Sequence, residues 1–83
     1  MISPAQIRAA RALLGLRQSE LALAAGVALA TVQRIEKSDA EISGSAKTLL
    51  KLHAALEQLG IIFIPKDEDR GVGVRLRKPS GNR

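Results

Sequence analysis

The sequence contains no cysteine, no tryptophan and no tyrosine, and Phe63 is its one phenylalanine. Without cysteine the chain has neither disulfides nor thiolate ligands, so its core has to be built from Ala, Leu, Ile and Val. At 83 residues there is room for one domain, whose small core usually needs a disulfide, a metal or a partner subunit as support. Because His53 is the one histidine, we expect oligomerisation to give that support, with no metal and no cofactor.

Long apolar runs are also missing from the sequence. Arginines follow soon after Met1, and no segment approaches the roughly 20 apolar residues that a membrane-spanning helix needs. The lack of cysteine is compatible with a reducing compartment, although it does not prove one. We expect a cytoplasmic protein that makes no contact with a membrane.

Acidic residues are fewer than basic ones, with 8 Asp and Glu against 13 Lys and Arg and a net charge of +5. This excess favours a polyanionic partner, because each basic group near a phosphate releases condensed counterions. It equally favours solubility, and Arg75, Arg77, Lys78 and Arg83 all follow the last acidic residue, Asp69. Charge alone therefore leaves both interpretations open.

Groups suited to catalysis are scarce. His53 has no cysteine to activate, and no pairing of a hydroxyl with a base is evident. The run Asp67 to Asp69 lacks the alternating spacing and the glycine of a calcium loop, which indicates a solvated turn. We expect no enzymatic activity, and we expect His53 to be a half-exposed helix residue.

Three short helices are predicted in the first half of the chain. Ser3, Pro4 and Gln6 form a helix-start signature, and apolar residues at helical spacing continue to about Leu14, before Gly15. A second helix is predicted for Gln18 to Ala25, ending at Gly26, and a third from about Leu29 to Lys37. The second and third helices therefore flank a three-residue turn.

The second half of the chain changes from helical to strand periodicity. Ser38 to Gly44 is predicted to be a loop, and Ser45 caps a fourth helix whose leucine stripe ends at Gly60. The β-prone run Ile61 to Ile64 and the alternating residues Val72 to Arg77 predict a β-hairpin closed by Pro65 to Gly71. The expected fold is mainly α, with four helices and a C-terminal β-hairpin. Its parts are a helical domain at residues 1–60, the hairpin at 61–77 and a basic flexible tail at 78–83.

Residues 18–36 read QSELALAAGVALATVQRIE, which resembles the Cro/phage-repressor-like, or Xre-type, helix-turn-helix family. The residues that carry the resemblance are Gln18, Leu21, Ala22, Gly26, Val27, Val32, Ile35 and Glu36, and with the flanking helices it covers roughly residues 4 to 60. Each has a physical reason: Ala22 is small where two helices cross closely, and Gly26 adopts the turn conformation cheaply. Val32 and Ile35 anchor the third helix, which leaves its opposite face free to enter a DNA groove.

The resemblance implies a sequence-specific transcriptional regulator, in particular a repressor that binds a palindromic operator as a homodimer. It also implies a salt bridge between Arg11 and Glu36, whose role we expect to be orientation more than net stability. The alternative is that these two are unconnected surface charges.

Double-stranded DNA would be contacted by the start of the third helix and by residues around it. The residues implied by the resemblance are Arg17, Gln18, Ala28, Leu29, Ala30, Thr31, Gln33, Arg34, Lys37, Ser45 and Lys47. Gln18 and Thr31 would contact phosphates, Gln33 suits adenine and Arg34 suits guanine. The alternative for Gln33 and Arg34 is a solvated helix face, and for Lys37, Ser45 and Lys47 it is plain solubility.

The sequence departs from the family pattern in two places within this region. Ala28, Leu29 and Ala30 are apolar where polar residues are often found, so they could contact a thymine methyl or a protein partner. Arg17 stands where Ser, Thr or Asn often caps the second helix, so the cap is weaker and the arginine is free to contact a phosphate. An antitoxin or anti-activator that binds another protein through the same fold therefore remains the second hypothesis.

The hairpin is a third departure from the family pattern and the expected dimerisation element. A lone two-stranded ribbon is marginal in water, and its edges invite pairing. Burial across a two-fold axis would place two recognition helices about one DNA turn, roughly 34 Å, apart. The residues expected in this interface are Ile62, Ile64, Val72, Val74 and Leu76. The alternative is that the hairpin packs only onto the fourth helix of its own chain.

Overall fold

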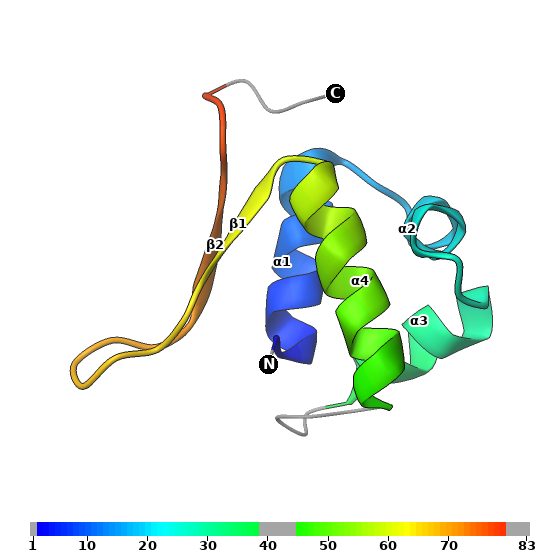
Figure 1. Ribbon diagram of the computed structural model, residues 1–83, viewed down its shortest axis with the longest axis horizontal. Coiled ribbons are helices and arrows are strands. Elements are labelled where there is room, and N and C mark those ends of the chain that lie inside the picture. Colours follow the sequence, from blue (N-terminus) through cyan, green and yellow to red (C-terminus); the bar gives the residue numbers. More distant parts are fainter. Residues whose placement is uncertain (1, 39–44, 80–83) are drawn as a thin grey trace.

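The computed structural model describes residues 2–38 and 45–79. Within these ranges four helices are followed by an antiparallel two-stranded sheet, which confirms the expected fold (Figure 1). The elements are α1 (Pro4–Leu14), α2 (Gln18–Ala25), α3 (Leu29–Lys37), α4 (Ala46–Gln58), β1 (Ile61–Ile64) and β2 (Gly73–Leu76). The predicted loop beyond Ser38 and the tail beyond residue 79 lie outside the described residues.

Helix α1 begins and ends where its local sequence chemistry predicts. The Ser3 hydroxyl accepts a hydrogen bond from the Gln6 backbone N–H at 3.2 Å, and the Gln6 side-chain oxygen accepts one from the Ser3 N–H at 2.9 Å. This reciprocal box satisfies two N–H groups that have no partner within the helix. At the other end Gly15 adopts the left-handed conformation with φ 67°, and the helix stops.

The turn between α2 and α3 depends on Gly26. Its φ is 70°, and a Cβ built at this position would have no atom within 4 Å. The glycine is therefore required by its backbone conformation and not by crowding. The Val27 N–H donates to the Ala22 carbonyl at 3.0 Å, and α3 starts two residues later, at Leu29.

Leucine and isoleucine side chains from every helix meet in one core. Helix α4 supplies much of it, after the Ser45 hydroxyl has capped its first turn by accepting from the Thr48 N–H. The largest fully buried side chains are Ile7, Leu21, Val32, Ile35, Leu49, Leu52, Leu56 and Ile61. None of the described helices is both long and apolar enough to cross a membrane.

The hairpin packs one face on the helices. Ile61 pairs with Leu76 and Phe63 with Val74, and these four side chains are buried or pack against the core. The opposite face carries Ile62 and Ile64, which are exposed. The connection spans residues 65–72, slightly more than the expected Pro65 to Gly71, because Val72 precedes β2.

Both α1 and α4 lie against this hairpin, so α4 is not its only support. The side chain of Gln6 is buried beneath it and donates from Nε2 to the carbonyl oxygens of Gly73 at 3.0 Å and Ile64 at 3.3 Å. The hairpin and the α2–α3 pair lie on opposite sides of α1 and α4 (Figure 1).

Candidate nucleic-acid interface

An ion pair fixes the end of α3 to α1. Arg11 donates from Nε to Glu36 Oε2 at 2.8 Å and from Nη2 to Glu36 Oε1 at 2.9 Å, a fork-to-fork geometry that defines orientation as well as distance. The Glu36 side chain is only 4% exposed. The hydrogen bonds that Arg11 donates to Glu36 raise the pKa of Arg11 above the usual arginine value, although partial burial opposes this.

The same carboxylate also binds α2. Gln18 donates from its side-chain nitrogen to Glu36 Oε1 at 3.0 Å, and Arg8 donates to the Glu36 backbone carbonyl. The third arm of the Arg11 guanidinium donates to the Leu16 carbonyl at 2.8 Å, in the link between α1 and α2. One buried glutamate therefore joins the three helices on which the orientation of α3 depends.

With Val32, Ile35 and Glu36 buried, α3 presents its remaining residues outward. Ala28, Leu29, Ala30, Gln33, Arg34 and Lys37 are exposed, and Thr31 is half-buried. The residues that the sequence analysis assigned to base contacts thus occupy one continuous face. The first turn of that face is apolar, since Leu29 is 41% exposed, and the second turn carries the polar groups.

The charge of this surface is positive. Arg34 and Lys37 lie on α3, and Lys47 is exposed on the first turn of α4. The two carboxylates of α2 and α3 are both paired with arginines: Glu36 binds Arg11, and Glu20 lies 3.6 Å from the Arg17 Nε and also accepts from the Arg17 backbone N–H at 2.9 Å. Neutralised acids and exposed bases suit a phosphate backbone.

The family model described as helix-turn-helix matches residues 7–61 of the chain. The chain belongs to the Xre/Cro-like helix-turn-helix family. Members of this family are DNA-binding regulators of transcription, and α2 and α3 are its helix-turn-helix pair in this chain. Among curated proteins, no relative matches the sequence.

Two residues expected to contact DNA, Gln18 and Ser45, also form hydrogen bonds within the domain. Gln18 was expected to contact a phosphate, and it is also held by Glu36. Ser45 was expected beside the DNA backbone, and its hydroxyl also donates to the Thr48 hydroxyl at 2.9 Å and caps α4. Arg17 precedes α2, is exposed and makes no side-chain cap, in agreement with the expected weak cap, but its guanidinium lies 3.6 Å from Glu20 and is therefore not free of a partner.

Sequence reasoning missed Arg8 and the second role of Gln6. The spacing of Arg8 places it on the exposed side of α1, but nothing in the pattern indicates that it reaches the end of α3. Gln6 carried a signal for helix capping alone. Its contact with the hairpin involves residues 58 and 67 positions away, which local spacing does not encode.

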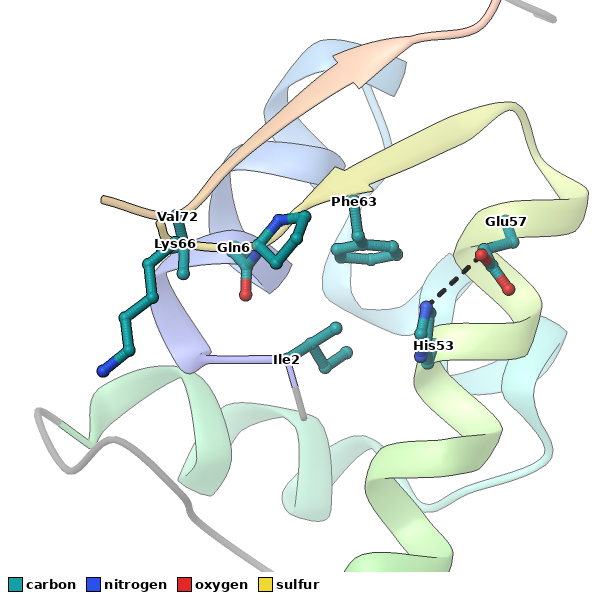
Figure 2. A pocket seen from close by; sticks show the side chains of 8 residues that line it. Ile2, Gln6, His53, Glu57, Phe63, Lys66 and Val72 are labelled. Atoms are coloured by element: carbon teal, nitrogen blue, oxygen red, sulfur yellow. Dashed lines mark ion pairs between the residues drawn. The ribbon is translucent and has the colours of Figure 1, made fainter. Parts of the chain in front are cut away.

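A hollow lies between α1, α4 and the hairpin, and the residues that line it do not include any of α3 (Figure 2). Its walls come from the start of α1, from α4 and from the hairpin, and include Ile2, Gln6, His53, Glu57 and Phe63. His53 makes an edge-to-face contact with Phe63, with ring centroids 4.6 Å apart, and its Nε2 lies 3.4 Å from Glu57 Oε2. The histidine is thus half-exposed on α4, as expected, and packs against the hairpin.

Proposed function

We propose that this Xre-type regulator is a repressor that binds a palindromic operator as a homodimer, with α3 in the major groove. Its family supplies the coarser statement, that it is a DNA-binding regulator. The proposal adds the groove, the symmetry and the direction of regulation. A function on chromosomal DNA also agrees with the cytoplasmic location expected from the sequence.

The observation that carries the proposal is the anchoring of α3. Val32, Ile35 and Glu36 fix its inner face, so the outer face is held in one orientation before any ligand arrives. A preorganised helix loses little conformational entropy on binding. Gln33 can then form two bonds with an adenine edge and Arg34 two bonds with a guanine edge.

The flanking residues are suited to phosphate contacts, which set register without reading sequence. Arg17, Lys37 and Lys47 are exposed cations near the two ends of the α2–α3 unit. Gln18 supplies an amide donor and Thr31 a hydroxyl donor, whereas Ser45 would have to exchange its bond to the Thr48 hydroxyl for one to a phosphate. One N–H of Gln18 is used by Glu36, and its second amide proton is the donor we assign to a phosphate.

The homodimer is supported by the exposed apolar residues of the hairpin. Ile62, Ile64 and Val72 are each exposed by 40% or more, whereas Val74 and Leu76 partly pack on their own core. A domain this small gains stability from a partner subunit. Two copies would also present two copies of α3, which a palindromic operator requires.

A protein-binding function, such as that of an antitoxin or anti-activator, is the second candidate. It is favoured by the apolar first turn of α3 together with Leu23 of α2, which is 86% exposed. Exposed apolar surface suits a protein partner as well as a thymine methyl. Under this hypothesis the ligand of α3 is another protein.

The test is fluorescence anisotropy with labelled genomic fragments from around the coding gene, at fixed salt. Gln33→Ala and Arg34→Ala should each lose about 1 to 3 kcal/mol of discrimination between the operator and an unrelated duplex. Gln58→Ala and Arg70→Ala remove the same side-chain types from α4 and the hairpin loop, and should retain it. Equal loss in all four variants would contradict the assignment of α3 as the reading helix.

The salt dependence of binding separates the two candidate functions. Phosphate contacts require that log Kd rises with log salt, with a slope of roughly 0.9 for each phosphate neutralised. Absence of DNA binding even at low salt would exclude the repressor and favour the protein partner.

A further inference from the structure

The outer edge of β2 carries backbone groups that point away from β1. The Arg77 N–H donates to the Gly60 carbonyl at 2.8 Å, and the register continues with Arg75 opposite Ile62 and Gly73 opposite Ile64. Because the groups of an antiparallel strand alternate between its two sides, those of Val74 and Leu76 face outward. Among the described residues, none outside the hairpin bonds to them.

A shallow groove runs beside this edge. Its apolar lining comes from Leu13 of α1 together with Val74 and Leu76, and its basic lining from Arg75, Lys78 and Arg77, whose guanidinium also donates to the Glu57 carbonyl. Leu13 is 45% exposed although it lies next to the core. An extended strand laid along β2 would cover the apolar lining and pair the outward backbone groups.

We propose that this strand is β2 of a second copy of the chain, antiparallel to the first. The inference rests on the proposed homodimer and specifies its interface. Joining the two hairpins at this edge makes one four-stranded sheet, in which the two-fold axis passes between the β2 strands. An unprotected sheet edge is a ready template for such pairing.

Side-chain matching selects the register of the two strands. Backbone hydrogen bonds between the two β2 strands can form only between residues whose backbone groups face outward. With the largest overlap of the two strands, the two-fold axis therefore passes either through Val74 or through Arg75. An axis at Arg75 would place two guanidinium groups directly opposite, which is unfavourable. An axis at Val74 pairs Leu76 with Val72 of the partner subunit and places Arg75 opposite Gly73 of the partner subunit.

The charges of the hairpin favour the antiparallel arrangement as well. Asp67, Glu68 and Asp69 occupy its exposed tip between Lys66 and Arg70, which leaves the tip a small negative charge, and Arg77 and Lys78 follow its base. Antiparallel strands bring the acidic tip of each hairpin toward the basic base of the other, whereas parallel strands would bring like charges together. Exposed charge pairs contribute little to affinity, but they do select orientation.

This interface divides the five residues that the sequence assigned to the dimer. Val72, Val74 and Leu76 belong to the β2 edge, while Ile62 and Ile64 lie on the outer face of β1 and stay outside it. The division gives a direct test, because the chain has no cysteine of its own and a single introduced thiol reports its own position.

Val74→Cys should form a disulfide-linked dimer under mild oxidation. The two residues would be a hydrogen-bonded antiparallel pair with Cα atoms about 5.5 Å apart, within the span of a disulfide. The matched control is Ile62→Cys, an exposed position on the same hairpin, which should stay unlinked under the same conditions. A dimer that links through Ile62→Cys and not through Val74→Cys would overturn the β2 edge and leave the homodimer intact.

Val74→Pro gives a second test, should the cysteine variant not fold. Proline removes only an outward N–H and is tolerated at a sheet edge. Both bonds of the central pair are lost, so the dimer dissociation constant should rise roughly tenfold or more by analytical ultracentrifugation, with unchanged circular dichroism. An unchanged dissociation constant, or a native chain that sediments as a monomer, would overturn the inference. Anisotropy with operator DNA measures the reading function of α3 separately.

Discussion

Glu36 joins α3 to both α1 and α2 through hydrogen bonds. It accepts from Arg11 and Gln18 through its side chain and from Arg8 through its backbone carbonyl. The pKa of Arg11 is raised by Glu36, so the charge of the arginine is fully present below its usual pKa and is lost only above the raised value. The arginine therefore stays charged across the neutral range, and its titration does not switch the pair there.

Glu36→Gln should destabilise the domain by about 2 to 3 kcal/mol, because Arg11 would keep its charge in a partly buried position without a counter-charge. Urea denaturation followed by circular dichroism measures this change. Glu68→Gln, at the exposed hairpin tip, is the control and should change stability by less than about 0.5 kcal/mol. Similar values for the two variants would mean that Glu36 contributes no more than a surface charge.

The apolar first turn of α3 gives a second prediction at this scale. If Ala28, Leu29 and Ala30 contact thymine methyl groups, replacing the thymines that face them with uracil removes one methyl each and leaves the hydrogen-bonding edge intact. The affinity should fall roughly fourfold per methyl, from about 0.8 kcal/mol of lost apolar contact. Uracil in flanking DNA is the control. Unchanged affinity would indicate that this turn does not lie against bases.

At the scale of elements, the helix boundaries could be predicted because they depend on local chemistry. Ser3 with Gln6, and Ser45, are capping side chains at short sequence separation, and Gly15 and Gly26 take positive φ. The alternation after Gly60 likewise predicted two strands. The face on which the hairpin docks could not be predicted, because it depends on contacts between Gln6 and a strand near the other end of the chain.

Gln6→Leu tests how the hairpin is held. The variant keeps a side chain of similar size but loses the donor to Gly73 and Ile64 and the acceptor for Ser3. The loss of these three hydrogen bonds should cost about 1 to 3 kcal/mol in total. Hydrogen exchange should show lower protection in β1 and β2, with α2 and α3 less affected. Gln58→Leu, on the exposed end of α4, is the control, and equal protection in both variants would contradict the role of Gln6.

The arrangement of the helices also explains which site residues could be predicted from the sequence. The recognition face follows from Val32 and Ile35 at helical spacing, which turns Gln33 and Arg34 outward. The Arg11 and Glu36 pair came from the resemblance and not from spacing, since the two are 25 residues apart. Arg8 and the second role of Gln18 depend on side-chain conformations that the pattern does not specify.

In the whole molecule, the surface proposed to read DNA and the surface proposed to bind a second copy are separated. Helix α3 and the hairpin lie on opposite sides of α1 and α4 (Figure 1), in a molecule that measures 33 × 29 × 18 Å. Dimerisation at β2 would therefore leave both copies of α3 uncovered. A continuous four-stranded sheet is also stiffer than a flexible tether, and this rigidity has a consequence for the operator.

A rigid dimer should require a fixed distance between half-sites. With the half-sites about 10 base pairs apart on one face of the duplex, both copies of α3 enter successive major grooves. Inserting 5 base pairs moves the second half-site to the opposite face, so only one subunit can bind and the affinity should fall to that of a single half-site. Anisotropy with a series of spacer lengths measures this dependence. Val74→Pro is the matched control, because a monomeric variant should bind all spacings equally, and a native protein indifferent to spacing would contradict a rigid dimer on the operator.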